Sequence, residues 1–379
     1  MIRKTEDIVI YKDPFYYISF PSCVTLDDGS VLLSCRRALD PRYLLGDDPD
    51  EALAARVTHV EARSHQALVR LNPDLSSAGP VRSIPMNPEA ADQDGSMLKL
   101  SSGRILLSAF SWYPFPPTFS DTVAATGLSF HGSADTTGSC YLFWGGFTRH
   151  TDDGGTHWTD HAYLPPIPDV PDIVPGKRPF HGGGIRGSAV ESDGEILIPT
   201  YSSAKPGRKS SAYVYASADY GANWAFRAET AVDTDGIVDM HEPALYRTPS
   251  GRIICFIRTA GLDDHLVTTE STDNGRTWSA WQKREPIGHP YTPIALPDGR
   301  VFLINGYRHE PYGIRARVLD PECSDIDTAE EFVIRDDGLG TDLGYPWATV
   351  MADGRVLAVY YIFGDDGLRH IAGSVLEVG

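Results

Sequence analysis

The sequence lacks the features that would direct it to a membrane, to nucleic acid or out of the cell. The residues after Met1 do not contain the apolar run of about 7–15 residues that a signal peptide needs, and no later segment approaches the roughly 18 apolar residues of a membrane span. Lysine and arginine number 33 against 51 aspartates and glutamates, and no basic stripe interrupts the net charge of −18. We therefore predict a cytoplasmic protein that binds neither membrane nor nucleic acid.

The sequence also lacks the common signatures of bound metals and cofactors. It contains no His-Glu-x-x-His motif, no clustered Cys/His spacing, no calcium-binding loop, and no phosphate-binding or dinucleotide-binding motif. Its five cysteines are odd in number and form no Cys-x-x-Cys pair, which is typical of reduced, buried thiols. The sequence predicts neither a metal site nor another cofactor.

What the chain does contain is a hairpin signature that occurs six times: an apolar run, a turn that ends in glycine, and a second apolar run. With 36 Gly and 28 Pro among 379 residues, the composition suits many turns. The repeat predicts six units of one four-stranded sheet each, with long insertions in the first two. The turns are Leu26–Gly29, Leu100–Gly103, Glu191–Gly194, Thr248–Gly251, Leu296–Gly299 and Met351–Gly354.

A second motif, Ser/Thr-x-Asp-x-Gly-x-x-Trp, occurs three times in the same phase, and it begins at Thr151, Ser217 and Ser271. The aspartate bonds the turn amides, the glycine takes a positive φ and the tryptophan covers the turn. These motifs are Asp boxes, and with them the sequence resembles the sialidase superfamily of BNR repeats over nearly its whole length. Degenerate boxes stand at 72–75 and 320–323.

The resemblance implies an all-β fold, a single six-bladed β-propeller domain over residues 1–379, with a sugar-binding site on its axis. We expect an N-terminal strand near residues 8–11 to complete the last sheet beside residues 371–378, because closing the ring leaves only short, protected edges. The Asp boxes themselves are expected to be structural elements of the outer rim.

Two segments resemble the catalytic segments of sialidases. A Glu-Pro pair at Glu242 and an arginine at the end of the following strand, Arg258, match the glutamate that polarises the nucleophile and one carboxylate-binding arginine. Tyr345 lies where the family carries its nucleophilic tyrosine. A neutral phenol suits an anomeric carbon that bears a carboxylate, because a charged nucleophile would be repelled. Packing roles, an inner Glu–Arg pair and an aromatic lining the pore, are the alternatives.

The arginines of the predicted site follow the family pattern only in part. Arg308 is the expected second carboxylate ligand and Arg315 is the second choice, while solvated loop arginines are the alternative. Sialidases open with Arg-Ile-Pro, whereas this chain has Ser19-Phe20-Pro21, so the first arginine of the family's triad is missing. Arg36 and Arg37 end the next strand, and we select Arg37 as the residue that reaches inward. The departure indicates a substrate that differs from sialic acid.

The family's acid/base aspartate lies on the loop after this strand, and here the loop is long. His59 falls near the expected place, and Asp40 and Asp47 are further candidates. Imidazole titrates near neutral pH, so a histidine here suits general acid/base catalysis. A solvated loop histidine is the alternative.

Other polar groups precede the second and third hairpins. Asp94 is expected at the inner end of its strand, and His181 and Arg186 flank a Gly-Gly-Gly run that lets backbone approach a ligand. Although His-Gly-Gly-Gly is also found in lipases, the chain has no Gly-x-Ser-x-Gly nucleophile motif, which argues against an esterase. Aromatic residues in the second-blade insertion are candidates either for a wall that stacks on sugar or for a packed loop: Trp112, Tyr113 and Phe115.

Three functional hypotheses follow. The leading one is an exo-acting glycoside hydrolase that removes a terminal, acidic sugar from a small oligosaccharide, with Tyr345 as nucleophile, Glu242 as its base and His59 as acid/base. The second is a lyase that eliminates across a uronate on the same fold. The third is a non-catalytic propeller that binds carbohydrate, since a fold does not dictate an activity.

Overall fold

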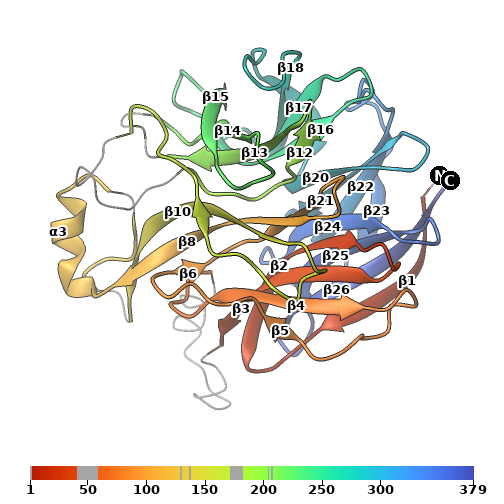
Figure 1. Ribbon diagram of the computed structural model, residues 1–379, viewed down its shortest axis with the longest axis horizontal. Coiled ribbons are helices and arrows are strands. Elements are labelled where there is room, and N and C mark those ends of the chain that lie inside the picture. Colours follow the sequence, from red (N-terminus) through yellow and green to blue (C-terminus); the bar gives the residue numbers. More distant parts are fainter. Residues whose placement is uncertain are drawn as a thin grey trace.

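The computed structural model describes residues 2–40, 59–128, 130–135, 138–170, 182–203, 205 and 208–379. Six antiparallel sheets succeed one another around a central axis, as Figure 1 shows, so the fold is an all-β, six-bladed propeller. This confirms the predicted fold class and number of blades.

The first three blades are built as follows. Blade 1 contains β2 (Tyr16–Thr25), β3 (Val31–Leu39), β4 (His65–Leu71) and β5 (Arg82–Ser83). Blade 2 contains β6 (Ala91–Asp92) and β7 (Ser96–Lys99), which both pair with β8 (Ile105–Phe115), then β10 (Cys140–Thr151), β11 (Ala162–Tyr163) and the added β9 (Phe130–His131). Blade 3 contains β12 (Val190–Ser192), β13 (Glu195–Ser202), β14 (Ser211–Ser217) and β15 (Ala225–Ala231).

The other three blades have four strands each. Blade 4 contains β16 (Asp239–Arg247), β17 (Ile253–Ala260), β18 (His265–Ser271) and β19 (Gln282–Ile287). Blade 5 contains β20 (His289–Ala295), β21 (Val301–Tyr307), β22 (Gly313–Leu319) and β23 (Phe332–Arg335). Blade 6 contains β24 (Gly344–Val350), β25 (Val356–Phe363), β26 (Arg369–Val378) and β1 (Ile2–Tyr11).

The repeated hairpin turns join the first and second strands of every blade. Their six final glycines have φ between 79° and 89°, in the left-handed region that favours glycine. In blade 1, for example, the amide of Gly29 donates to the carbonyl of Leu26 at 3.0 Å. The hairpin predictions are therefore confirmed.

The three complete Asp boxes lie between the third and fourth strands of blades 2, 3 and 4, on the outer side of these blades. In the first complete box, Asp153 accepts hydrogen bonds from the amides of Thr156 and His157, both at 2.9 Å. A side chain at Gly155 would meet Leu32 of blade 1 at 2.9 Å, so this glycine allows two blades to pack closely. These contacts support the structural role expected of the boxes.

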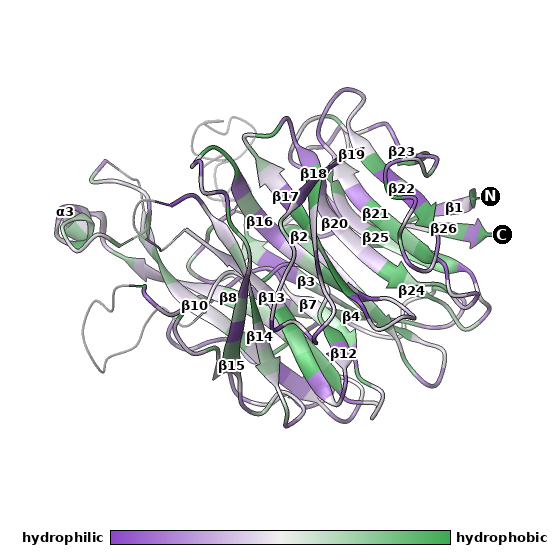
Figure 2. Cartoon of the chain, turned by 90° about the horizontal axis from the view of Figure 1, so that it is seen from above, coloured by the Kyte–Doolittle hydropathy of each residue, from purple (hydrophilic) through white to green (hydrophobic). Residues whose placement is uncertain are grey.

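The N-terminal strand closes the ring. Strand β1 pairs antiparallel with β26, with Ile8 opposite Gly373 and Tyr11 opposite Ile371, as the sequence predicts. The two termini consequently lie side by side in both Figure 1 and Figure 2.

The core lies in layers between neighbouring blades. One cluster joins blades 1 and 6 around Leu33, Trp347 and Leu357, and another joins blades 4 and 5 around Phe256 and Leu303. Each fully buried aliphatic or aromatic side chain of this kind contributes about 1.5–3 kcal/mol to folding. All five cysteines are buried and unpaired.

The main departure from a plain propeller is in blade 2. Strands β8 and β10 extend beyond the sheet and carry a 3₁₀ turn, η1 (Pro117–Phe119), and a short helix, α3 (Ser120–Ala124), which project from the ring in Figures 1 and 2. None of the helices that the structure describes is long and apolar enough to cross a membrane.

Candidate active site

The inner strands carry irregularities at one end of the ring, and these aim side chains at the axis. In β2, β16 and β24 two residues oppose a single residue of the next strand, which is a β-bulge. In each bulge the first residue has a positive φ and is followed by proline. These residues are Phe20 (54°), Glu242 (46°) and Tyr345 (46°). Such conformations are costly for residues other than glycine and are concentrated at functional sites.

These three bulge residues line one pocket of about 740 Å³. Blades 1 to 4 and 6 contribute to its wall, and the extension of blade 2 forms one side. The other lining residues are His59, Val60, Gln93, Asp94, Phe110, Trp112, His131, Gly132, Ser133, Asp135, Ser139, Tyr141 and Tyr201.

Tyr345 and Glu242 form a buried hydrogen-bonded pair at the base of this pocket. The hydroxyl of Tyr345 donates a short hydrogen bond to Oε1 of Glu242. Arg258 on β17 bridges the two, because its Nη1 lies 2.7 Å from Oε2 of Glu242 and 3.1 Å from the hydroxyl of Tyr345. The structure thus brings together three residues that the sequence predicts from blades 4 and 6.

The protonation states of the pair are set by its surroundings. Burial opposes ionisation of Glu242, but the charge of Arg258 and the hydrogen bond from Tyr345 hold its pKa at about 2, below the ordinary 4.5. Burial and the charge of Glu242 raise the pKa of Tyr345 well above 10. The resting pair is therefore a phenol and a carboxylate, with the acceptor already in place for the phenol proton.

Arg308 also lies against Tyr345. Its guanidinium carbon is 5.4 Å from the centre of the Tyr345 ring, and its Nε and Nη2 donate to the carbonyl of Leu343 at 3.3 and 3.2 Å. The reserve candidate, Arg315, instead donates to backbone carbonyls of its own blade, including that of Pro311. Two arginines, Arg258 and Arg308, thus flank the tyrosine.

Arg186 supports the pocket from within the fold, which corrects its prediction as a substrate ligand. It is 1% exposed, and its guanidinium donates to the carbonyls of Gly95, Pro21 and Tyr345 at 3.1, 2.9 and 2.7 Å. These bonds join blade 3 to three other blades, so the arginine holds the bulges of blades 1 and 6 in place.

The prediction for Arg37 is also corrected, because this side chain points away from the pocket. It bonds His65 and Ser83 at 3.1 and 2.9 Å and stacks on Tyr16. Side chains alternate between the two faces of a strand, so its neighbour Arg36 points the other way. The guanidinium carbon of Arg36, a fully buried residue, is 5.9 Å from the ring centre of Phe20.

His59 lies at the pocket edge and contacts a carboxylate that the sequence did not single out. Its Nε2 is 3.2 Å from Oδ1 of Asp342 and 3.4 Å from the hydroxyl of Tyr17. The alternative candidate Asp40 is buried in blade 1, and Asp47 lies outside the described residues.

Asp94 lines the pocket as predicted, in the interruption between β6 and β7. Burial raises its pKa from 3.8 to about 6, Arg186 opposes this shift and Glu242 adds to it. His181 lies outside the described residues.

One face of the blade 2 extension forms an aromatic wall. Trp112 lines the pocket with His131, whose ring centre is 4.6 Å away. Tyr113 instead stacks on Trp144 at 5.0 Å, and Phe115 packs on Phe130. Of the three aromatic candidates for a sugar-stacking wall, the structure places only Trp112 in the pocket lining.

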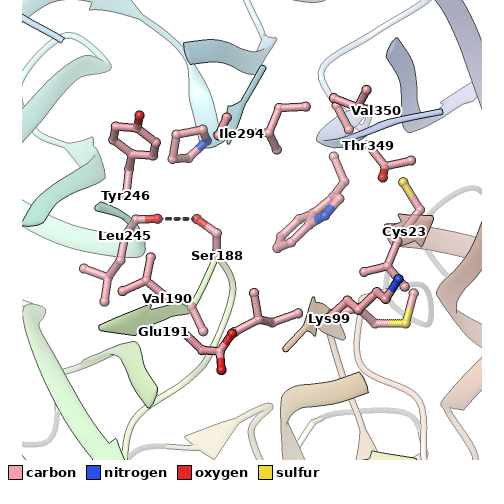
Figure 3. A pocket seen from close by; sticks show the side chains of 18 of the residues that line it. Cys23, Lys99, Ser188, Val190, Glu191, Leu245, Tyr246, Ile294, Thr349 and Val350 are labelled. Carbon is pink, nitrogen blue, oxygen red and sulfur yellow. Dashed lines mark hydrogen bonds between the residues drawn. The ribbon is translucent and has the colours of Figure 1, made fainter. Parts of the chain in front are cut away.

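A second pocket, of about 450 Å³, lies at the opposite end of the axis, where all six inner strands contribute (Figure 3). Aliphatic residues such as Val190, Leu245 and Ile294 dominate its wall, and its labelled polar groups are engaged, as in the bond from Ser188 to the Leu245 carbonyl at 2.8 Å. In the part of the chain that the structure describes, no three His, Cys, Asp or Glu residues are placed to hold a metal ion.

A fixed distance in the sequence from the turn glycine marks one pocket residue in each of four blades. Phe20, Asp94, Glu242 and Tyr345 each stand nine residues before the turn glycine of their blade, at positions 29, 103, 251 and 354. This spacing could have identified Phe20, which sequence reasoning missed. No comparable local signal marks Asp342, because its partners come from distant strands.

Comparison with known proteins agrees with this architecture. The BNR repeat-like domain family matches residues 131–358. A crystal structure of a protein of unknown function from Dyadobacter fermentans is 34% identical, with a TM-score of 0.87 over 100% of this chain and 99% of that one. No curated protein matches the chain.

Solved sialidases share the fold at low identity. The NanB sialidase of Streptococcus pneumoniae, as its K499G mutant, is 13% identical with a TM-score of 0.63, over 97% of this chain and 70% of its own. The intramolecular trans-sialidase of Ruminococcus gnavus, in complex with oseltamivir carboxylate, is 15% identical with a TM-score of 0.58, over 97% of each chain. The chain therefore belongs to the BNR repeat-like family, and it shares the six-bladed β-propeller fold of the solved sialidases.

Proposed function

We propose that the protein is an exo-acting glycoside hydrolase that removes a terminal acidic sugar from a small oligosaccharide. The observation that carries the proposal is the buried contact among Tyr345, Glu242 and Arg258 at the base of an open pocket. A hydrogen-bonded nucleophile and base, oriented by a third group, is the arrangement expected for nucleophilic catalysis.

In the proposed reaction Tyr345 attacks the anomeric carbon while its proton passes to Glu242. The glycosidic C–O bond breaks, and the leaving oxygen takes a proton from His59. Water then attacks the anomeric carbon, and the bond from this carbon to the tyrosine oxygen breaks. His59 accepts a proton from that water, and Glu242 returns its proton to the tyrosine oxygen. Two displacements at one carbon predict retention of configuration.

The acidic character of the substrate rests on Arg258 and Arg308, which flank the tyrosine. Two guanidinium groups suit a carboxylate near the reacting carbon. The absence of the family's first arginine, at Ser19, supports a substrate different from sialic acid. A pocket rather than a long groove favours a terminal residue over an internal one.

The test is incubation of the protein with sialosides, ulosonosides, uronosides and neutral glycosides, followed by mass spectrometry of the products. Tyr345→Phe and Glu242→Gln should abolish hydrolysis. Tyr360→Phe is a matched control, because this buried tyrosine bonds Ser374 and Arg335 away from the pocket. Hydrolysis that survives in both active-site variants, or absence of hydrolysis across the panel, would refute the proposal.

A uronate lyase is the second candidate, favoured by the two histidines that line the pocket, His59 and His131. In an elimination, one group removes the proton next to the carboxylate and another protonates the leaving oxygen. The product would be unsaturated and would absorb in the near ultraviolet, whereas a hydrolysis product gains water.

A further inference from the structure

The carboxylate of Asp342, three residues before Tyr345, is surrounded by donors from three strands. Its Oδ1 accepts from the hydroxyls of Tyr17 on β2 and Tyr361 on β25, both at 2.9 Å. Its Oδ2 accepts from Nε of Arg369 on β26 at 2.9 Å. His59 approaches the same carboxylate from the pocket side at 3.2 Å.

These contacts keep Asp342 charged. Burial by itself would raise the pKa of this carboxyl, but the hydrogen bond and charge of His59, together with Arg369 and Tyr17, hold it well below 3.8. With both oxygens bonded, the carboxylate has a fixed orientation, and it presents negative charge to Nε2 of His59. The side chain of His59 is 53% exposed, so its ring is accessible to a ligand.

We propose that Asp342 is a positioning residue that orients His59 as the general acid and base of the proposed hydrolase. Because Nε2 is held by the carboxylate, Nδ1 is the nitrogen available to the substrate. The imidazolium donates its Nδ1 proton to the leaving oxygen, and the neutral ring later takes one proton from the attacking water. Asp342 stays ionised throughout and holds the ring in one orientation.

This arrangement has the logic of the aspartate in serine hydrolases, which orients a histidine without being protonated. Among the residues that the structure describes, Asp342 and Tyr17 contact His59, Arg369 and Tyr361 bond the carboxylate of Asp342, and His131 interacts with His59 electrostatically. Only Asp342 carries a negative charge in this set. It is therefore the group that favours a proton on Nε2.

The first test compares Asp342→Asn, His59→Gln and the double variant on methyl and 4-nitrophenyl glycosides of sialic and uronic acids. Nitrophenolate leaves without a proton, whereas methoxide needs one, so each single variant should lose kcat/KM about 100-fold on methyl glycosides and less than about 5-fold on nitrophenyl glycosides. The double variant should lose no more than His59→Gln alone.

Asp233→Asn is the control, because Asp233 bonds backbone amides of Ile237 and Val238 away from the pocket. Equal losses on both leaving groups, or additive losses in the double variant, would overturn the role of Asp342.

The second test needs no substrate and no variant that alters the fold. In protein labelled with ¹⁵N-histidine, the His59 signals are identified by their loss in His59→Gln, and the neutral ring is expected to carry its proton on Nε2. A proton on Nδ1 would overturn the proposal. If no glycoside is cleaved, the hydrolase is refuted, while this spectrum still decides whether Asp342 orients His59.

Discussion

Replacing Asp94 by asparagine is expected to stabilise the protein at neutral pH, although the residue lines the pocket. Asp94 is 5% exposed and lies near Arg186 and Glu242. Burial, assisted by repulsion from Glu242, outweighs the attraction of Arg186 and raises the pKa of Asp94 from 3.8 to about 6. At pH 7 the folded state therefore contains a carboxylate that would be more favourable in water.

The sign and size of the expected stability change follow from the linkage between protonation and folding. The folded state holds the Asp94 proton more tightly than the unfolded state, so the contribution of this group to stability is fully present below pH 3.8 and is lost as pH rises through about 6. A difference of about 2 between the two pKa values corresponds to roughly 3 kcal/mol at pH 7. Asparagine carries no charge at any pH and should recover up to about that amount.

The assay is urea denaturation of both proteins between pH 4 and pH 8, followed by tryptophan fluorescence. The gain of Asp94→Asn should be largest above pH 6 and should vanish near pH 4. Asp233→Asn is a control in which we expect the opposite change, a loss of stability at neutral pH, because backbone hydrogen bonds lower the pKa of Asp233. A loss of stability in Asp94→Asn that is equal at pH 4 and pH 7 would refute the reasoning, since Asp94 would then contribute through contacts that do not depend on its charge.

Three further predictions concern the residues that support the site. Glu242→Gln should lower the free energy of unfolding by about 3–5 kcal/mol at pH 7, because Arg258 keeps a buried charge without its partner. Since the pKa of Glu242 is lowered to about 2, this loss should be present above pH 4.5 and should decline as pH falls toward 2, which urea titrations at several pH values would show. Arg186→Met should lower both the Tm and kcat, because three buried carbonyls, including that of Tyr345, lose their donor; an unchanged kcat would contradict the supporting role. Deleting residues 2–11 should lower the Tm in a thermal melt, because β26 becomes an open edge.

The fold could be predicted from the sequence because its markers act locally. A turn glycine such as Gly29 and a box aspartate such as Asp153 are required by the geometry of a few neighbouring residues. Their repetition in one phase then fixes the number of blades and the order of strands. The compartment, the boundaries of the domain and the oligomeric state have no such marker, and the first two stay predictions.

The site was only partly predictable, for a physical reason that the arginines illustrate. Arg36 and Arg37 are adjacent on β3 and point to opposite faces of the sheet, so their position near the strand end does not say which of the two turns inward; the register of β3 against its neighbours decides it. Arg186 stands beside a glycine run as a substrate ligand would, yet its three partners come from blades 1, 2 and 6. Contacts between distant segments leave no trace in local sequence.

The positions nine residues before the turn glycines also show where the candidate site of this chain differs from the sialidase pattern. Blades 4 and 6 place Glu242 and Tyr345 at that position, whereas blade 1 places Phe20 there, beside the serine that stands for the missing arginine. The ring centre of Phe20 is 4.6 Å from that of Tyr345 and 5.3 Å from that of Tyr361. An aromatic ring at this place shields the phenol from water and offers no charge to a substrate. We therefore expect the residues of blades 4 and 6 to determine the type of reaction. The specificity for one sugar should depend on the group of that sugar that faces blade 1.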